Sequence, residues 1–254
     1  MKNNRLNQIL VILGVVVTLT INILADVLPI NGLGTGTISD QFQVFFVPAG
    51  YVFSIWGLIY LGLIAYAVFQ ALPAQRDNPR LKGIVGWFLL SSAANSAWIF
   101  LWHYLMFGWT LVAMVILLVS LIAIYLKLEI GRGQVSSGEK WFVRLPFSIY
   151  LGWITVATIA NVTDVLKWVN WSGWGIAPQT WAAIMLAAAV VVAALMTFTR
   201  RDGAYLLVLV WAFSGIAVKF PSEQLVSTSA WAASALCVLF FVYTLLQKRI
   251  HRTT

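Results

Sequence analysis

The sequence predicts an all-α fold, a polytopic membrane helix bundle of about eight transmembrane helices. Of the 254 residues, 61% are hydrophobic and only 9% are charged, whereas about a quarter of the residues in soluble domains are charged. This composition excludes a soluble globular protein and an intrinsically disordered chain. A disulfide scaffold is excluded because Cys237 is the only cysteine. The net charge of +8 comes from short basic clusters between apolar runs, which is typical of membrane topology and not of nucleic-acid binding.

Apolar runs and their interruptions define eight candidate spans. In chain order they are residues 9–30, 49–72, 84–106, 109–126, 141–162, 178–199, 204–218 and 225–246. The first follows a short basic segment but lacks a convincing cleavage site, so we interpret it as a helix and not as a signal peptide. The seventh is the weakest, because about 15 residues rise only about 23 Å as a helix. Tyr205 and Trp211 support it.

The basic residues fall on one side of the membrane when these eight spans are threaded in order. That side receives 14 of the 16 basic residues: Lys2, Arg5, Arg76, Arg80, Lys82, Lys127, Arg132, Lys140, Arg144, Arg200, Arg201, Lys248, Arg249 and Arg252. The other side receives Lys167 and Lys219. We therefore expect both termini in the cytoplasm, and the short basic N-terminus favours a bacterial inner (plasma) membrane. The loop 31–47 is interpreted either as a lid over a site or as a slack connection.

Three of the spans carry aromatic stripes at helical spacing. The stripes are Phe53, Trp56 and Tyr60; Asn95, Trp98 and Trp102; and Tyr150, Trp153, Ala157 and Asn161. Each stripe lies on one helix face and includes an amide or a phenol. Such faces would suit a flat apolar ligand with a few polar edges, although stripes of this kind more often pack helices together.

The spacing of these residues resembles the TspO/MBR family of tryptophan-rich sensory or translocator proteins. The matching motifs are Pro48 before the second span, Trp56-x-x-x-Tyr60, Asn95-x-x-Trp98, Gly108-Trp109 and Trp153-x-x-x-Ala157-x-x-x-Asn161. The departures are Gly50 at a family tryptophan, Ser91 at a glutamine, Ile149 at a proline, and Phe53 one residue late. The resemblance covers roughly residues 9–170.

The resemblance implies a five-helix core with a pocket between its helices. We therefore divide the chain into a TspO-like core, residues 1–170, and about three additional helices with a basic tail, residues 171–254. The family binds porphyrins and other flat hydrophobic molecules, including sterols. The ligand-binding residues that the resemblance implies are Trp56, Asn95, Trp98, Trp153, Ala157, Phe53, Tyr60, Tyr150 and Asn161.

Other chemistry has less support in the sequence. His103 is interpreted as an interface residue, with axial heme ligation as the alternative. Lys219 is interpreted as a snorkelling side chain and not as a Schiff-base lysine. Asp26 and Asn22 lie too near a helix end for an ion relay. No metal cluster and no catalytic constellation is present in the sequence.

The expected function is a sensor or carrier that binds a flat hydrophobic ligand, with a tetrapyrrole first and a sterol-like molecule or lipid next. The alternatives are a structural or assembly subunit of a membrane complex, and a secondary transporter. We expect no required cofactor, with porphyrin or heme as ligand, and no enzyme activity apart from the porphyrin photodegradation that the resemblance implies. Expected partners are membrane lipids and either a second copy of the chain or a membrane-complex partner, with no nucleic acid.

Overall fold

The computed structural model describes the backbone of residues 2–28 and 30–253 and the side chains of residues 4–28 and 30–247. In this part of the chain every regular element is helical. The long helices are α1 (Lys2–Val27), α3 (Ile55–Ala71), α4 (Pro79–His103), α5 (Phe107–Lys127), α7 (Leu145–Trp168), α8 (Pro178–Arg200), α9 (Gly203–Lys219) and α10 (Gln224–Thr253). Short elements are η1 (Ile30–Gly32), α2 (Thr35–Ser39), η2 (Gly50–Ser54), η3 (Pro73–Gln75), α6 (Ser137–Glu139), the π-turn η4 (Lys140–Arg144) and η5 (Gly173–Gly175).

The helix lengths confirm an all-α polytopic membrane bundle. Seven segments of the described chain are long and apolar enough to cross a membrane. Helix α9 is the predicted weak span, and its 17 residues rise about 26 Å. The other predicted spans each overlap one long helix, with ends shifted by up to seven residues.

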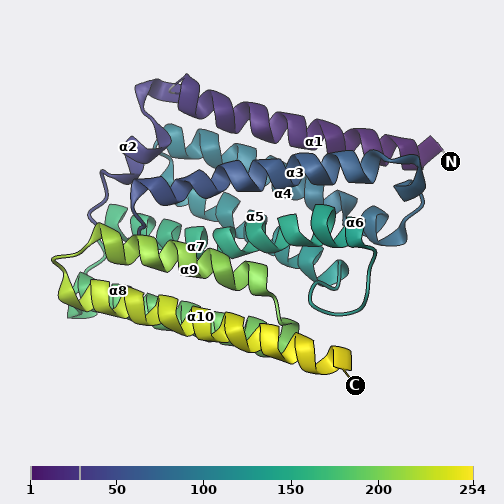
Figure 1. The fold of residues 1–254 in the computed structure, drawn as a ribbon. Helices are drawn as coiled ribbons and strands as arrows, with labels where there is room; N and C mark the ends of the chain where they lie inside the picture. The colour runs from purple at the N-terminus through teal and green to yellow at the C-terminus, as the bar shows by residue number, and fades with distance from the viewer. Residues whose placement is uncertain (1, 29, 254) are drawn as a thin grey trace.

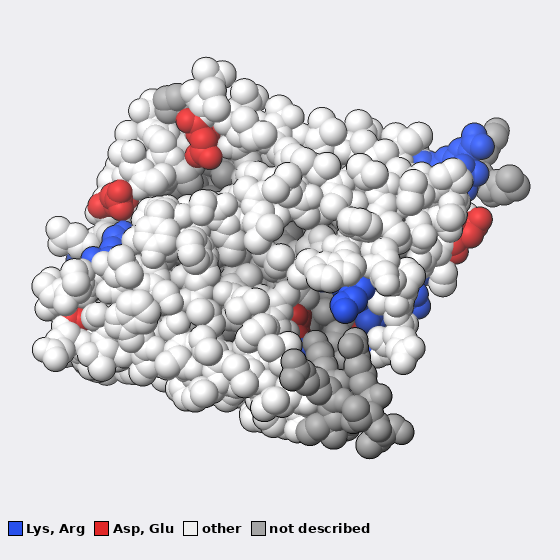
Figure 2. Space-filling model, in the orientation of Figure 1, with Lys and Arg blue, Asp and Glu red and all other residues white. Residues whose placement is uncertain are grey.

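The long helices run side by side, and both ends of the chain lie at the same end of the bundle (Figure 1). We call this the terminal end and the opposite end, which carries α2, the α2 end. Figure 2 shows a largely uncharged band along the helices, with lysine and arginine side chains gathered mainly at the terminal end of the visible face. The predicted orientation also used Lys2, Lys248, Arg249 and Arg252, whose side chains lie outside the described residues.

Five helices form a closed ring. Going around it, α1 contacts α3, α3 contacts α7, α7 contacts α5, α5 contacts α4, and α4 contacts α1. Helix α9 packs against α7 outside the ring, and α8 and α10 pack against α9. The ring therefore surrounds a central space, and α9 joins it to the outer helices. The predicted division at residue 170 falls just after α7 and stays a prediction.

Local capping explains where several of these helices begin. Pro79 and Pro178 occupy the first turns of α4 and α8, where a missing backbone N–H has no consequence. The side chain of Asn78 accepts a 3.1 Å hydrogen bond from the backbone N–H of Arg80. Asp202 caps α9 in the same way, since its Oδ1 accepts from the backbone N–H groups of Ala204 and Tyr205.

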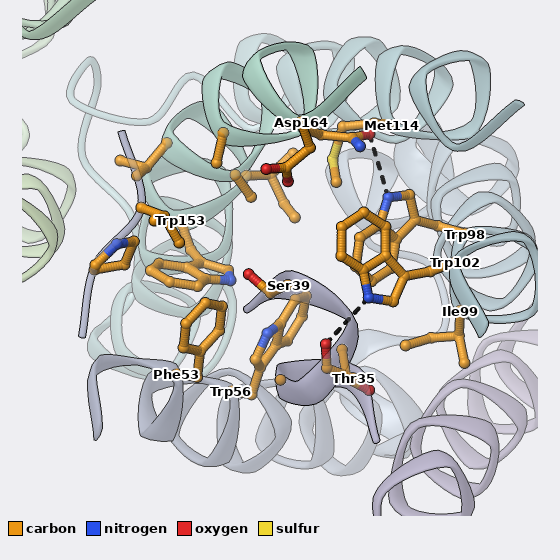
Figure 3. Close-up of a pocket in the computed structure, with 18 of the residues that line it drawn as sticks. Thr35, Ser39, Phe53, Trp56, Trp98, Ile99, Trp102, Met114, Trp153 and Asp164 are labelled. Carbon is orange, nitrogen blue, oxygen red and sulfur yellow. Dashed lines mark hydrogen bonds between the residues drawn. The ribbon is translucent and has the colours of Figure 1, made fainter. Parts of the chain in front are cut away.

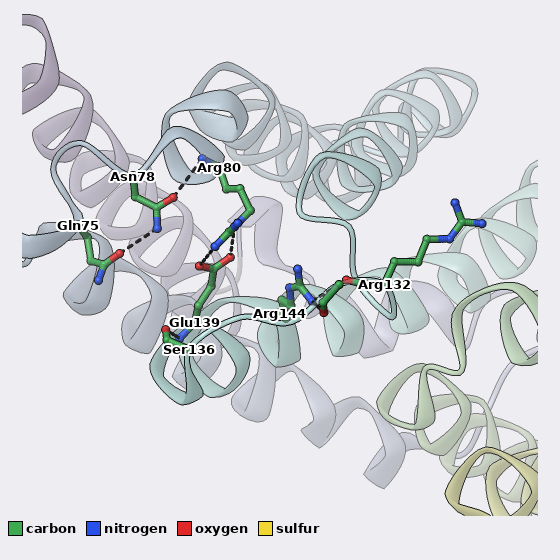
Figure 4. Close-up of polar contacts among 8 residues, drawn as sticks. Gln75, Asn78, Arg80, Arg132, Ser136, Glu139 and Arg144 are labelled. Atoms are coloured by element: carbon green, nitrogen blue, oxygen red, sulfur yellow. Dashed lines mark hydrogen bonds and ion pairs between the residues drawn. The ribbon is translucent and has the colours of Figure 1, made fainter. Parts of the chain in front are cut away.

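Polar contacts at the terminal end fix the turn between α5 and α7 (Figure 4). Arg80 donates from Nε and Nη2 to the two carboxylate oxygens of Glu139, over 2.6 and 2.9 Å. The Arg144 guanidinium donates to the backbone carbonyls of Arg132 and Gly133. These contacts hold the start of α4 against α6 and the start of α7 against the turn that precedes it.

Candidate ligand-binding site

A cavity of about 520 Å³ lies inside the five-helix ring, at its α2 end. This volume is typical of small-molecule sites, which span about 300 to 1,000 Å³. Its walls come from α1, α3, α4, α5 and α7, from α2 and residues 47–50, and from the end of α9. Most of the lining is apolar or aromatic, and about a third of the lining residues are polar or charged.

Tryptophans from three helices form two facing walls (Figure 3). On one side, Trp56 meets Trp153 edge to face, with ring centroids 6.3 Å apart, and Phe53 packs edge-on to Trp153 at 5.7 Å. On the other side, Trp98 and Trp102 stack at 5.1 Å with an angle of 17° between their rings. Residues four apart on a helix share a face, which is why Trp98 and Trp102 can stack. The walls offer broad aromatic faces to a flat molecule.

Eight of the nine predicted ligand-binding residues line this cavity. They are Phe53, Trp56, Tyr60, Asn95, Trp98, Trp153, Ala157 and Asn161. The exception is Tyr150, which is buried behind Trp56 with ring centroids 6.0 Å apart. Tyr150 lies about one turn nearer the terminal end of α7 than Trp153 and does not line the cavity. The structure thus brings the predicted set together, and ligand binding by these residues stays a prediction.

The amides in the cavity already have protein partners. Asn22 donates from Nδ2 to Oδ1 of Asn95 over 2.7 Å. Asn161 accepts from Trp98 Nε1 at 3.3 Å and donates to Thr110 Oγ1 at 2.9 Å. These bonds join α1 to α4, and α4 and α5 to α7, so the amides act as interhelical contacts as well as lining groups.

Two buried polar atoms of the lining have no hydrogen-bond partner among the described residues. They are the indole Nε1 of Trp153 and the carboxylate Oδ1 of Asp164. Trp153 is 2% exposed and Asp164 is 5% exposed. Both point into the cavity (Figure 3). Buried polar groups usually have partners, so these two are the groups that a bound molecule would satisfy.

Helix α2 covers one end of the cavity. Trp102 donates from Nε1 to the backbone carbonyl of Thr35 over 3.2 Å. The Thr35 hydroxyl lies 2.9 Å from Nε2 of His103, and Nδ1 of His103 lies 3.2 Å from the carbonyl of Ile30. Both ring nitrogens of His103 therefore contact the segment that carries α2, and the histidine is not part of the cavity lining. Of the two interpretations of loop 31–47, the structure favours a cover.

Helix α9 holds the chain segment that forms another edge of the cavity. The backbone N–H of Ala49 donates to the carbonyl of Gly215 over 3.1 Å. Trp211 donates from Nε1 to the carbonyl of Val52 over 3.0 Å. A Cβ atom at Gly215 would overlap Cγ2 of Val52, so glycine permits this close approach.

Some groups of the lining fall outside the set predicted from the sequence. Asp164 lies three residues after Asn161 and seven after Ala157, so extending the α7 stripe by one turn would have included it. Asp40 and Lys219 come from opposite ends of the chain, and their 3.5 Å contact depends on how α9 packs. No local pattern carries that information.

The chain matches the model of a known protein family. That family is described as TSPO-like protein, and its model matches residues 8–243. The match includes α8, α9 and most of α10, which the resemblance read from the sequence left outside. No curated protein and no solved structure matches the chain.

Proposed function

Because the chain belongs to the TSPO-like protein family, we propose that its cavity binds a flat hydrophobic ligand and that the protein acts as a sensor or carrier of that ligand. The observation that carries this proposal is the aromatic cavity, in which Trp56 and Trp153 face Trp98 and Trp102. A tetrapyrrole such as a porphyrin is the first ligand to test, with sterol-like molecules and lipids next.

The geometry supports a planar ligand more than a globular one. A planar ring that enters between the two walls would stack on indole faces, and aromatic contacts add about 0.5 to 1.5 kcal/mol each beyond simple burial. Trp153 Nε1 offers the ligand a free donor, since it has no partner in the described chain. The bonds that hold Asn95 and Asn161 keep the walls in place before a ligand arrives, which lowers the entropy cost of binding.

We further propose that the protein resides in a bacterial inner membrane with the terminal end in the cytoplasm. The shared end of the two termini and the basic residues gathered there support this orientation. In this orientation the cavity lies under the non-cytoplasmic surface, and α2 separates it from that side.

Titration of the detergent-solubilised protein with protoporphyrin IX and with heme tests the proposal. Tryptophan quenching and the Soret band would be followed for the wild type, Asn95→Ala and Trp153→Phe. Trp141→Phe is the matched control, because Trp141 is 57% exposed and lies at the terminal end outside the cavity.

We expect saturable binding that both cavity variants weaken and the control leaves unchanged. If the folded wild type shows no saturable binding, the tetrapyrrole proposal is wrong. If all three variants bind like the wild type, the ligand binds outside this cavity.

A further inference from the structure

The cavity lining contains more acidic than basic groups among the described residues. Three carboxyl groups line it, those of Asp26, Asp40 and Asp164, together with one basic group, that of Lys219. Lys219 is engaged at the edge, with Nζ 3.5 Å from Oδ1 of Asp40. Asp26 is exposed and accepts a long, 3.4 Å hydrogen bond from Thr35. Among the described residues, Asp164 is therefore the one buried carboxyl group of the lining, and no described basic side chain contacts it.

The position of Asp164 relative to the aromatic walls is the second observation. Its carboxyl group projects into the cavity between Trp153 and the stacked pair Trp98 and Trp102 (Figure 3). Its Oδ1 is buried without a hydrogen-bond partner in the described chain. An ionised carboxylate in such surroundings is costly unless a cation or a strong donor meets it. The cavity provides room for that partner, because Asp164 lines it directly.

A ligand that carries a positive charge on an aromatic ring system fits both observations. Indole faces attract ammonium groups through the ring quadrupole, and a carboxylate adds a charge-assisted hydrogen bond. We propose that Asp164 is the specificity-determining residue of the cavity and selects flat aromatic ligands that carry a protonated amine. This inference rests on the proposed function, since it assigns the ligand class of the same site.

The carboxyl group of Asp164 also affects how an anionic ligand could bind. A ligand carboxylate placed beside an ionised Asp164 would meet a like charge in a poorly solvated site, so it could bind there only while one of the two groups is protonated. The acid groups of a tetrapyrrole avoid this cost when they lie at the cavity edge, near Lys219, with the apolar ring inside. A cationic aromatic amine has no such restriction.

Three anthracenes of equal ring size test the inference on the full chain in detergent. They are 9-(aminomethyl)anthracene, which is a cation at neutral pH, the neutral 9-methylanthracene, and the anion anthracene-9-carboxylate. Binding would be measured by tryptophan quenching for the wild type, Asp164→Asn and Asp77→Asn. Asp77→Asn is the matched control, because it removes the same charge from an exposed turn outside the cavity. Trp153→Phe reports whether each probe occupies the cavity.

We expect the cation to bind the wild type at least about tenfold more tightly than the neutral probe, and Asp164→Asn to remove that preference. The Asp77→Asn control should retain it. Equal affinity for cation and neutral probe in the wild type, or preference for the anion, overturns the inference while leaving the proposed function standing. A preference that persists in Asp164→Asn also overturns it. If the neutral probe shows no saturable binding sensitive to Trp153→Phe, the proposed function itself fails.

Discussion

The hydroxyl of Ser148 on α7 donates a 2.6 Å hydrogen bond to Oδ2 of Asp202, the residue that caps α9. The same carboxylate oxygen accepts from the phenol of Tyr125 on α5, over 2.9 Å. Asp202 is 7% exposed, so these contacts lie inside the bundle. One carboxylate therefore connects two helices of the ring to the start of α9.

Asp202→Ala should destabilise the protein by about 2 to 4 kcal/mol, because it removes a helix cap and leaves two buried hydroxyl groups without their acceptor. Thermal unfolding in detergent, followed by tryptophan fluorescence, would measure the fall in Tm. Asp77→Ala is the control, since its carboxylate is exposed. A Tm for Asp202→Ala equal to that of the control would contradict a structural role for this contact.

Gly215→Ala should weaken ligand binding although Gly215 does not line the cavity. The added Cβ would overlap Val52 and approach Cβ of Pro48 to 3.2 Å, which displaces the segment that forms the cavity edge. Binding of 9-methylanthracene, compared with Gly86→Ala, would measure the effect. Gly86 is the matched control because a Cβ there meets nothing within 4 Å. Equal affinities in the two variants would show that the close approach of Gly215 to Val52 does not shape the site.

Asn22 and Asn95 should be energetically coupled. Their 2.7 Å bond joins α1 to α4, and interhelical bonds of this kind in membranes contribute about 0.6 to 1.7 kcal/mol. A double-mutant cycle with Asn22→Ala and Asn95→Ala, read by unfolding in detergent, would measure the coupling. Strictly additive losses would mean that each amide acts through other contacts.

Lys219→Met should leave stability almost unchanged, because partly exposed ion pairs contribute only about 0 to 1 kcal/mol. It should, however, remove the one basic group of the cavity lining and so strengthen binding of 9-(aminomethyl)anthracene. Unfolding and titration of the same preparation would check both expectations. Weaker binding of the cation would argue against electrostatic selection in this cavity.

The sequence was sufficient for the bundle and for the aromatic walls of the cavity, but not for most of the other residues that line it. Hydrophobic runs of about 20 residues define the crossings, and i, i+3, i+4 spacing defines which side of a helix faces inward, as at Trp153, Ala157 and Asn161. Tyr150 follows the same spacing but does not line the cavity, because periodicity gives the direction of a side chain and not the depth at which the space between helices closes. The roles of Gly215 and Trp211 were not predictable, since they depend on α9 packing beside a segment far away in the chain.

The contact between Trp211 and Val52 spans 159 residues, and this separation bears on how the protein is made. A ribosome adds about 5 to 20 residues per second, so Val52 would be synthesised roughly 8 to 32 seconds before its partner. During that interval the first helices could already occupy the membrane while the backbone of residues 47–54 lacks its final neighbour. The cavity is therefore completed late in biogenesis. A nascent chain arrested before α9 would contain the cavity tryptophans but would lack the contacts that hold the cavity edge formed by residues 47–54.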